Sequence, residues 1–279
     1  MTTKSTTKPV AFRVTPAPHL RSPASVPKIF WGRAAALLPL LIAFLFLFHV
    51  QALRILGVVL ITALLTKVGA AMSRRHNAIK LYDGSMVYTA LLFSFLVPPT
   101  MPSWMMAVGI FVSIFAAGEI FGGLGSYFLN PALVGSAFLQ LSFPEMFSNG
   151  SFFFVDSATG QWAVLAALGL GGLALVLMKG VDWRVPFFYL TAAVLLEKIF
   201  LAPAAAAIPM GRLFFAAFFL MADCETLPLA RSGRKVFAIL AAAFTLILKN
   251  FSLVPLPEVF AVLSVNLLTP WLDQWMRAK

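Results

Sequence analysis

The sequence contains few of the residues from which water-soluble enzymes build their active sites. Only 11% of its 279 residues are charged, and Cys224 is its one cysteine. A single cysteine excludes an intrachain disulfide and any cysteine-rich metal or iron–sulfur site made by this chain alone. The histidines, His19, His49 and His76, are not accompanied by a Ser/His/Asp arrangement or by metal-ligand spacing. We therefore expect neither a hydrolase nor a metalloenzyme.

Hydrophobic residues are what the sequence has in abundance. They make up 61% of the chain, including 28 Phe, and the mean hydropathy is +0.92. Ordinary globular proteins are about 25% charged, so this composition indicates a polytopic membrane protein. One crossing needs about 20 apolar residues, which predicts about ten transmembrane helices joined by short loops. The apolar runs behind this prediction span residues 31–50, 52–72, 84–98, 103–121, 127–143, 162–178, 185–202, 205–222, 236–253 and 257–272.

The formal net charge of +11 is distributed as in a membrane protein rather than as in a nucleic-acid-binding one. Most lysines and arginines fall in alternate loops, while the other loops keep only Arg54, Lys198 and Lys249. By the positive-inside rule, both termini are expected in the cytoplasm of a bacterial inner (plasma) membrane. Nucleic acid is not an expected partner, whereas the lipid bilayer is.

The number of predicted spans also predicts the arrangement of the halves. About ten spans divide into two sets of five, and an odd number per set places the two sets in opposite orientations. We therefore expect an all-α integral membrane fold with two inverted five-helix repeats. Its parts would be a basic cytoplasmic tail (1–30), a first half (31–143), an outer loop (144–161) and a second half (162–279).

A glycine-rich break interrupts the apolar sequence within FGGLGSYFLNPALVG, at residues 121–135. Asn130 is a typical N-cap residue, and Pro131 suits the first turn of a helix. Glycines lower the cost of an unwound approach to that helix, and they lie at Gly122, Gly123 and Gly125. Broken helices at bilayer depth usually line a binding or transport site. A plain kinked span is the alternative.

Carboxylates within or beside the spans are candidates for an ion path because charges at bilayer depth are costly. These are Asp83, Glu119 and Glu225. Glu119 directly precedes the glycine break, although it could instead extend to the inner surface. The eighth apolar run ends at Asp223, with Thr226 nearby, which predicts a second half-site; a solvated loop is the alternative.

Several longer segments together resemble one family of membrane proteins. They include DGSMVYTALLFSFLVPPTMPSW (Asp83–Trp104), the FGGLGSYFLNPALVGSAF block, MADCETLPLARSGRKVFAI (Met221–Ile239) and VFAVLSVNLLTPWLD (Val259–Asp273). Their order and spacing are similar to those of the RnfD/NqrB family, whose members are membrane subunits of the Rnf complex and of the sodium-pumping NADH:quinone reductase. The resemblance covers most of the chain.

This resemblance implies a ten-helix inverted-repeat fold and a function in electron transport. Members carry FMN on a threonine of an outer-side motif, Asp-x-x-Ser/Thr-Gly-Ala-Thr, while their complex moves Na⁺ or H⁺. The resemblance thus implies partner subunits, FMN, and a possible second, noncovalent flavin. Cofactor-binding positions would be the glycine break with Asn130 and Pro131, the segment with Asp223 and Thr226, and a loop with Asp156 and Thr159.

The chain departs from the family pattern at the flavin loop. If Asp156 is the motif's aspartate, Gln161 and Trp162 replace Ala-Thr and the acceptor is missing. A compressed alignment makes Thr159 the acceptor but brings Asp156 too close, and an ordinary polar loop is the third possibility. A second departure is Glu119, near which the family pattern places a lysine. A redox-inactive transporter or channel of the same fold, and a scaffold subunit of a redox complex, are therefore the alternative functions.

Overall fold

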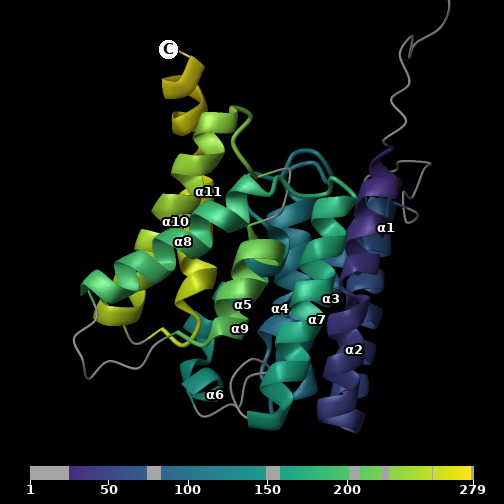
Figure 1. The fold of residues 1–279 in the computed structure, drawn as a ribbon. Helices are drawn as coiled ribbons and strands as arrows, with labels where there is room; N and C mark the ends of the chain where they lie inside the picture. The colour runs from purple at the N-terminus through teal and green to yellow at the C-terminus, as the bar shows by residue number, and fades with distance from the viewer. Residues whose placement is uncertain are drawn as a thin grey trace, which may run out of the picture.

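The computed structural model describes residues 25–73, 83–148, 158–200, 208–221, 226–252 and 254–277, in which all regular elements are helices, so the predicted all-α class is confirmed for them. Figure 1 shows the helices packed side by side, with the C-terminal helices α8, α10 and α11 at one side of the bundle. In chain order the elements are α1 (Val26–Ala36), α2 (Leu38–Ser73), α3 (Ser85–Leu96), α4 (Ser103–Ile114), the π-helical turn η2 (Phe115–Glu119), α5 (Pro131–Ser142), α6 (Pro144–Ser148), α7 (Ala158–Leu177), α8 (Arg184–Phe200), α9 (Met210–Phe215), the π-helical turn η3 (Ala216–Leu220), α10 (Arg231–Phe251) and α11 (Pro257–Arg277).

The second part of α2 runs antiparallel to α3. Lys67, late in α2, forms an ion pair with Asp83, just before α3 begins. Earlier in α2, the Arg54 guanidinium donates to the carbonyl of Pro99, beyond the end of α3, at 2.6 Å. These two contacts define the ends of the bundle, which we call the Asp83 end and the Pro99 end.

By contrast, α1 and the first part of α2 run parallel to α3. Phe30 packs edge-on against Tyr88 near the start of α3, with 6.1 Å between ring centroids, and Phe44 packs against Phe95 near its end, at 5.4 Å. The chain therefore reverses within α2. His49 is the reversal point, because its φ of 43° and ψ of −115° are not helical. The two predicted runs, 31–50 and 52–72, are the two arms of this hairpin.

Large apolar side chains cover much of the exterior. Phe46, Val50 and Leu177 are 75%, 78% and 73% exposed. Among the described residues, the run Val26–Ser73 is long enough and apolar enough to span a membrane, and only 28% of its most apolar window is buried inside the protein. Five further apolar helices are shorter than that test requires. Such a surface is stable in lipid rather than in water, so the chain is a membrane protein.

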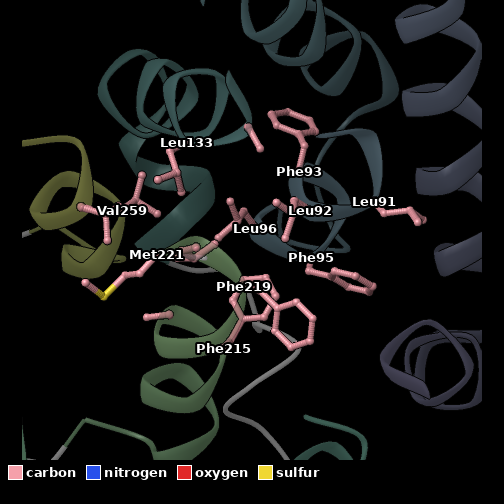
Figure 2. Packing of buried hydrophobic residues seen from close by; sticks show 14 of the residues in the cluster. Leu91, Leu92, Phe93, Phe95, Leu96, Leu133, Phe215, Phe219, Met221 and Val259 are labelled. Carbon is pink, nitrogen blue, oxygen red and sulfur yellow. The ribbon is translucent and has the colours of Figure 1, made fainter. Parts of the chain in front are cut away.

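The interior is filled by aliphatic and phenylalanine side chains, which Figure 2 shows converging from α3, α5, η3 and α11. Small residues let the helices approach closely. A Cβ added at Gly135 in α5 would lie 2.6 Å from the carbonyl oxygen of Gly109 in α4, and one added at Gly171 in α7 would collide with the carbonyl of Ala36. Contacts of this kind are common between membrane helices, which gain little from apolar burial alone.

Helices α5 and α11 lie next to each other and run in opposite directions. Near the end of α5, the Gln140 Oε1 accepts the N–H of Leu256, just before α11 begins, at 3.2 Å. Trp104, near the start of α4, packs edge-on against Phe143, directly after α5. The Gln140–Leu256 contact therefore lies at the Pro99 end. From there α11 returns toward the Asp83 end.

Polar contacts also fix the remaining helices. The Arg33 guanidinium donates to the carbonyl of Gly180 at 3.0 Å, which brings the end of α7 to the Asp83 end. Arg234, in the first turn of α10, pairs with Asp182 at 3.1 Å. Lys249, near the C-terminal end of α10, pairs with Glu197, near the C-terminal end of α8, at 3.5 Å.

Several predicted boundaries differ from the observed ones, mainly at prolines. The first helix begins at Val26, inside the predicted tail, because Pro27 suits a first turn. The predicted run 127–143 is helical only from Pro131, and the predicted outer loop 144–161 contains α6 and the start of α7. Apolar composition continues through such helix starts, so hydropathy alone does not locate them.

Candidate functional site

The predicted helix break is present between η2 and α5. The N–H groups of Ile120 and Gly123 donate to the carbonyls five residues earlier, at 2.9 and 3.2 Å, which widens the last turn. No helix follows until Pro131. The chain then needs glycine, because φ is 116°, 85° and 94° at Gly122, Gly123 and Gly125.

Asn130 ends the break as a helix cap, as predicted. Its Oδ1 accepts the N–H of Ala132 at 3.0 Å, and Pro131 occupies the first helical position. Ser113 in α4 donates its hydroxyl to the Pro131 carbonyl at 2.7 Å, which ties the new helix to the one before the break. Asn130 is 2% exposed, and its Nδ2 has no hydrogen-bond partner within the described part of the chain.

Lys67, Asp83 and Ser85 form a compact polar cluster beside the break. The Lys67 Nζ lies 3.3 Å from Asp83 Oδ2 and 3.0 Å from Ser85 Oγ. Asp83 Oδ1 also accepts the N–H and the hydroxyl of Ser85, at 3.0 and 2.8 Å, at the start of α3. Side chains of Lys67 and Asp83 are only 12% and 7% exposed. A buried charge pair with this many partners is held in one geometry.

The cluster and the break share a cleft. Lys67 and Ser85 line it together with Glu119, Tyr127 and Pro131. Glu119 is 8% exposed, so its side chain lies inside the protein. The structure therefore brings Glu119, Pro131 and the Asp83 partner Lys67 together around one cleft.

The cleft has donors suited to an anionic or carbonyl-bearing group, but not the volume for a flavin. Lys67 offers a cationic donor, whereas Asn130, whose Nδ2 has no partner among the described residues, does not line the cleft. The room that a water-sized sphere can occupy there is about 10 Å³. That is about the space of one water molecule, so the whole isoalloxazine ring does not fit here. An ion or a small polar group does.

The second predicted half-site is described only in part. Thr226 is 4% exposed, and its carbonyl accepts the Thr269 hydroxyl of α11 at 3.0 Å. Asp223 and Glu225 lie outside the described residues. Thr226 does not line the cleft at Glu119, so the two half-sites are separate places in the fold.

The sequence matches known proteins along most of its length. The model of the NQR2, RnfD, RnfE family matches residues 13–161 and 146–279. The chain belongs to this family.

Among its relatives is the D subunit of the ion-translocating oxidoreductase complex of Methanosarcina acetivorans, 30% identical over 87% of each chain. The D subunit of the proton-translocating ferredoxin:NAD⁺ oxidoreductase complex of Clostridium ljungdahlii is 29% identical over 95% of this chain and 94% of its own. The D subunit of the Na⁺-translocating ferredoxin:NAD⁺ oxidoreductase complex of Acetobacterium woodii is 26% identical over the same shares.

In this member of the NQR2, RnfD, RnfE family, Thr159 of the predicted flavin loop lies far from the cleft. Asp156 is outside the described residues, and Thr159 is the second residue of α7. Helix α7 has 20 residues, and its other end reaches the Asp83 end of the bundle through Arg33. At 1.5 Å per residue, the start of α7 is about 30 Å from that end. The structure does not bring Thr159 and the glycine break together.

The position of Lys67 bears on the second departure from the family pattern. The family pattern places a lysine near Glu119 in sequence, which this chain lacks, whereas Lys67 of α2 lines the same cleft as Glu119. The cleft thus has both charges, although the sequence near Glu119 has only one. Tertiary contacts between α2, α3 and η2 supply what the local sequence lacks.

Two buried features were not among the predicted site residues. Glu258, in the first turn of α11, binds Arg212 of α9, and Asn266 in α11 is 1% exposed. The signal for Glu258 was present, since an acidic residue directly after Pro257 is typical of a helix start. Asn266 gave a weaker signal, an amide within an otherwise apolar run four residues before Pro270.

Proposed function

We propose that this chain is the membrane subunit of an Rnf/Nqr-type ion-translocating electron-transport complex, coupling electron transfer to movement of Na⁺ or H⁺. The observation that carries this proposal is the helix break between Glu119 and Pro131, which lines a cleft that also holds the charged side chain of Lys67. Unwound backbone at membrane depth is tolerated where it lines such a space, and transporters place ion sites there. The names of its relatives, two of which specify different ions, are consistent with this function.

The proposed architecture has about ten membrane helices in two inverted halves. Its support is that α5 and α11 both begin with a proline, Pro131 and Pro257, and run in opposite directions from opposite ends of the bundle. We further propose that the Asp83 end faces the cytoplasm. Arg33, Lys179 and Arg234 gather at that end, in accord with the positive-inside rule.

Flavin binding is part of the proposal, with Thr159 as the covalent attachment position for FMN. Bound flavin would supply one- and two-electron transfer at the Pro99 end of the bundle. In-gel flavin fluorescence of the chain, co-produced with a flavin-transferring maturation enzyme, tests this directly. We expect fluorescence that disappears in Thr159→Val and persists in Thr191→Val, a change at an exposed threonine of α8. Absence of fluorescence in the unchanged chain would remove covalent FMN from the proposal.

The coupling function is tested in membrane vesicles containing the chain and its partner subunits. Ion uptake and electron transfer are measured together for Lys67→Met and Glu119→Gln, with Lys198→Met as an exposed control. We expect both cleft variants to lose ion uptake by a larger factor than electron transfer, because they alter charges beside the ion path. Equal effects of all three variants would contradict a role of the cleft in coupling.

A redox-inactive transporter is the second candidate, favoured by Gln161 and Trp162 in place of the motif's Ala-Thr. It predicts ion or solute uptake that continues when electron flow is blocked. A scaffold subunit would instead leave both measured rates unchanged in the cleft variants. The same vesicle experiment therefore separates the three functions.

A further inference from the structure

Asn266 lies near the middle of α11 with a buried amide whose hydrogen-bonding capacity is unused. The residue is 1% exposed, and neither Oδ1 nor Nδ2 has a hydrogen-bond partner among the residues that the structure describes. Most buried polar side-chain atoms in proteins are hydrogen-bonded, since leaving one unpaired costs free energy. If this position served only helix packing, an apolar residue such as leucine would be expected there instead of asparagine.

Pro270 takes a further hydrogen bond away from the same residue. In a regular helix, the N–H of residue 270 would donate to the carbonyl of residue 266, but proline has no N–H. Pro270 lies inside α11. The main-chain oxygen of Asn266 thus loses its usual donor, and Asn266 offers two oxygen atoms within one turn of helix.

Thr269 adds a third oxygen to this part of α11. Its hydroxyl donates to the carbonyl of Thr226 at 3.0 Å and to that of Val265 at 3.3 Å, so its proton is engaged while its lone pairs stay available. Residues 266 and 269 are three apart and lie on one face of the helix. The Thr226 contact fixes this face against the segment that follows η3.

The position of Asn266 matches the depth of the first helix break. Asn266 follows Leu256 by ten residues, and Asn130 precedes Gln140 by ten residues. Since Gln140 and Leu256 are in contact and α5 and α11 are antiparallel, both asparagines lie about 15 Å along their helices from that contact. Each half of the chain therefore holds a buried, incompletely bonded asparagine at a similar depth.

We propose that Asn266 Oδ1, the Asn266 carbonyl and Thr269 Oγ1 bind a monovalent alkali cation of the size of Na⁺. Neutral oxygens suit a monovalent cation, whereas Ca²⁺ sites are built mainly from carboxylates. Because the amide atoms are covered by protein, the ion exchanges its water shell for protein oxygens. The inference rests on the proposed function in one respect: the bound cation would be the ion that the complex moves.

The test uses the full chain purified in detergent, with thermal unfolding followed in NaCl and in choline chloride at equal ionic strength. A ligand that binds the folded state raises its unfolding temperature. We expect Na⁺ to raise it by at least about 2 °C, and the rise to vanish in Asn266→Leu. Asn250→Leu, at an exposed asparagine of α10, is the matched control and should keep the Na⁺ response.

Pro270→Ala is the second variant, because alanine restores the N–H that occupies the Asn266 carbonyl. We expect it to be folded and to show a smaller Na⁺-dependent shift than the unchanged chain, which keeps the test valid if Asn266→Leu does not fold. No Na⁺-dependent shift in the unchanged chain, or an undiminished shift in Asn266→Leu, would overturn the site. Failure of the chain to assemble with redox partners would instead count against the proposed function, because this binding measurement needs no partner.

Discussion

Arg212 and Glu258 form a two-point ion pair within the second half of the chain. Arg212 Nε lies 2.8 Å from Glu258 Oε1, and Arg212 Nη2 lies 2.7 Å from Oε2. Nη2 also donates to the carbonyl of Pro255 at 2.7 Å. One guanidinium in α9 therefore holds both the proline-rich approach to α11 and the first turn of that helix. Parallel bonds of this kind are the strongest geometry available to an arginine and a carboxylate.

We expect Arg212→Ala to destabilise the protein by about 3 kcal/mol, because Glu258 would remain as a buried charge without its cation. Arg212→Lys should recover part of this loss but not all, since an ammonium does not reproduce the two-point contact. Thermal unfolding in detergent measures both variants, with Lys198→Ala as an exposed control. An Arg212→Ala protein as stable as the control would contradict a structural role for the pair.

The close approach of α4 and α5 makes a second prediction. A methyl group at Gly135 would lie 2.6 Å from both the Gly109 carbonyl and the Ser113 Cβ, and backbone cannot move aside cheaply. We expect Gly135→Ala to cost about 1–3 kcal/mol through overpacking.

Gly169 in α7 is the matched control because nothing lies within 4 Å of an added Cβ there. Gly169→Ala should be neutral or slightly stabilising, as alanine is the better helix former. Similar unfolding temperatures for the two variants would show that the helices pack less tightly.

The helix break and its capping asparagine were predictable from sequence because glycine, asparagine and proline act through local backbone rules. Apolar runs likewise predicted most helices, including both arms of the hairpin at His49. The partner of Asp83 was not predictable, since Lys67 is brought to it by the packing of α2 against α3. The same holds for Arg212 and Glu258, which are far apart in sequence and meet only because α9 and α11 begin close together. Local backbone rules predict where a helix is interrupted or capped, whereas tertiary packing determines which charged side chains lie beside the break.

The cap at Asn130 allows a third prediction. Asn130→Ala removes the acceptor for the Ala132 N–H and should destabilise the start of α5 by about 1 kcal/mol. Asn130→Asp keeps an acceptor and should retain most of the stability lost in the alanine variant. Hydrogen exchange at the first turn of α5 is the measurement, since it reports local opening rather than global unfolding. Exchange in Asn130→Ala equal to that of the unchanged chain would contradict the cap.

The Lys67–Asp83 pair gives the last prediction, in which a double-mutant cycle separates the pair from its parts. Lys67→Met leaves the Asp83 carboxylate buried, with the N–H and hydroxyl of Ser85 still donating to it but without a cation at hydrogen-bond distance. We expect this variant to lose about 2 kcal/mol of stability, and Lys67→Met/Asp83→Asn to lose less than the two single changes combined.

The Arg234–Asp182 pair is the comparison, because its side chains are 30% and 15% exposed and water screens their attraction. We expect its coupling energy to be below about 1 kcal/mol. Equal coupling in the two cycles would mean that the Lys67–Asp83 pair is as accessible to water as the Arg234–Asp182 pair, and would remove the reason for placing an ion path beside Lys67.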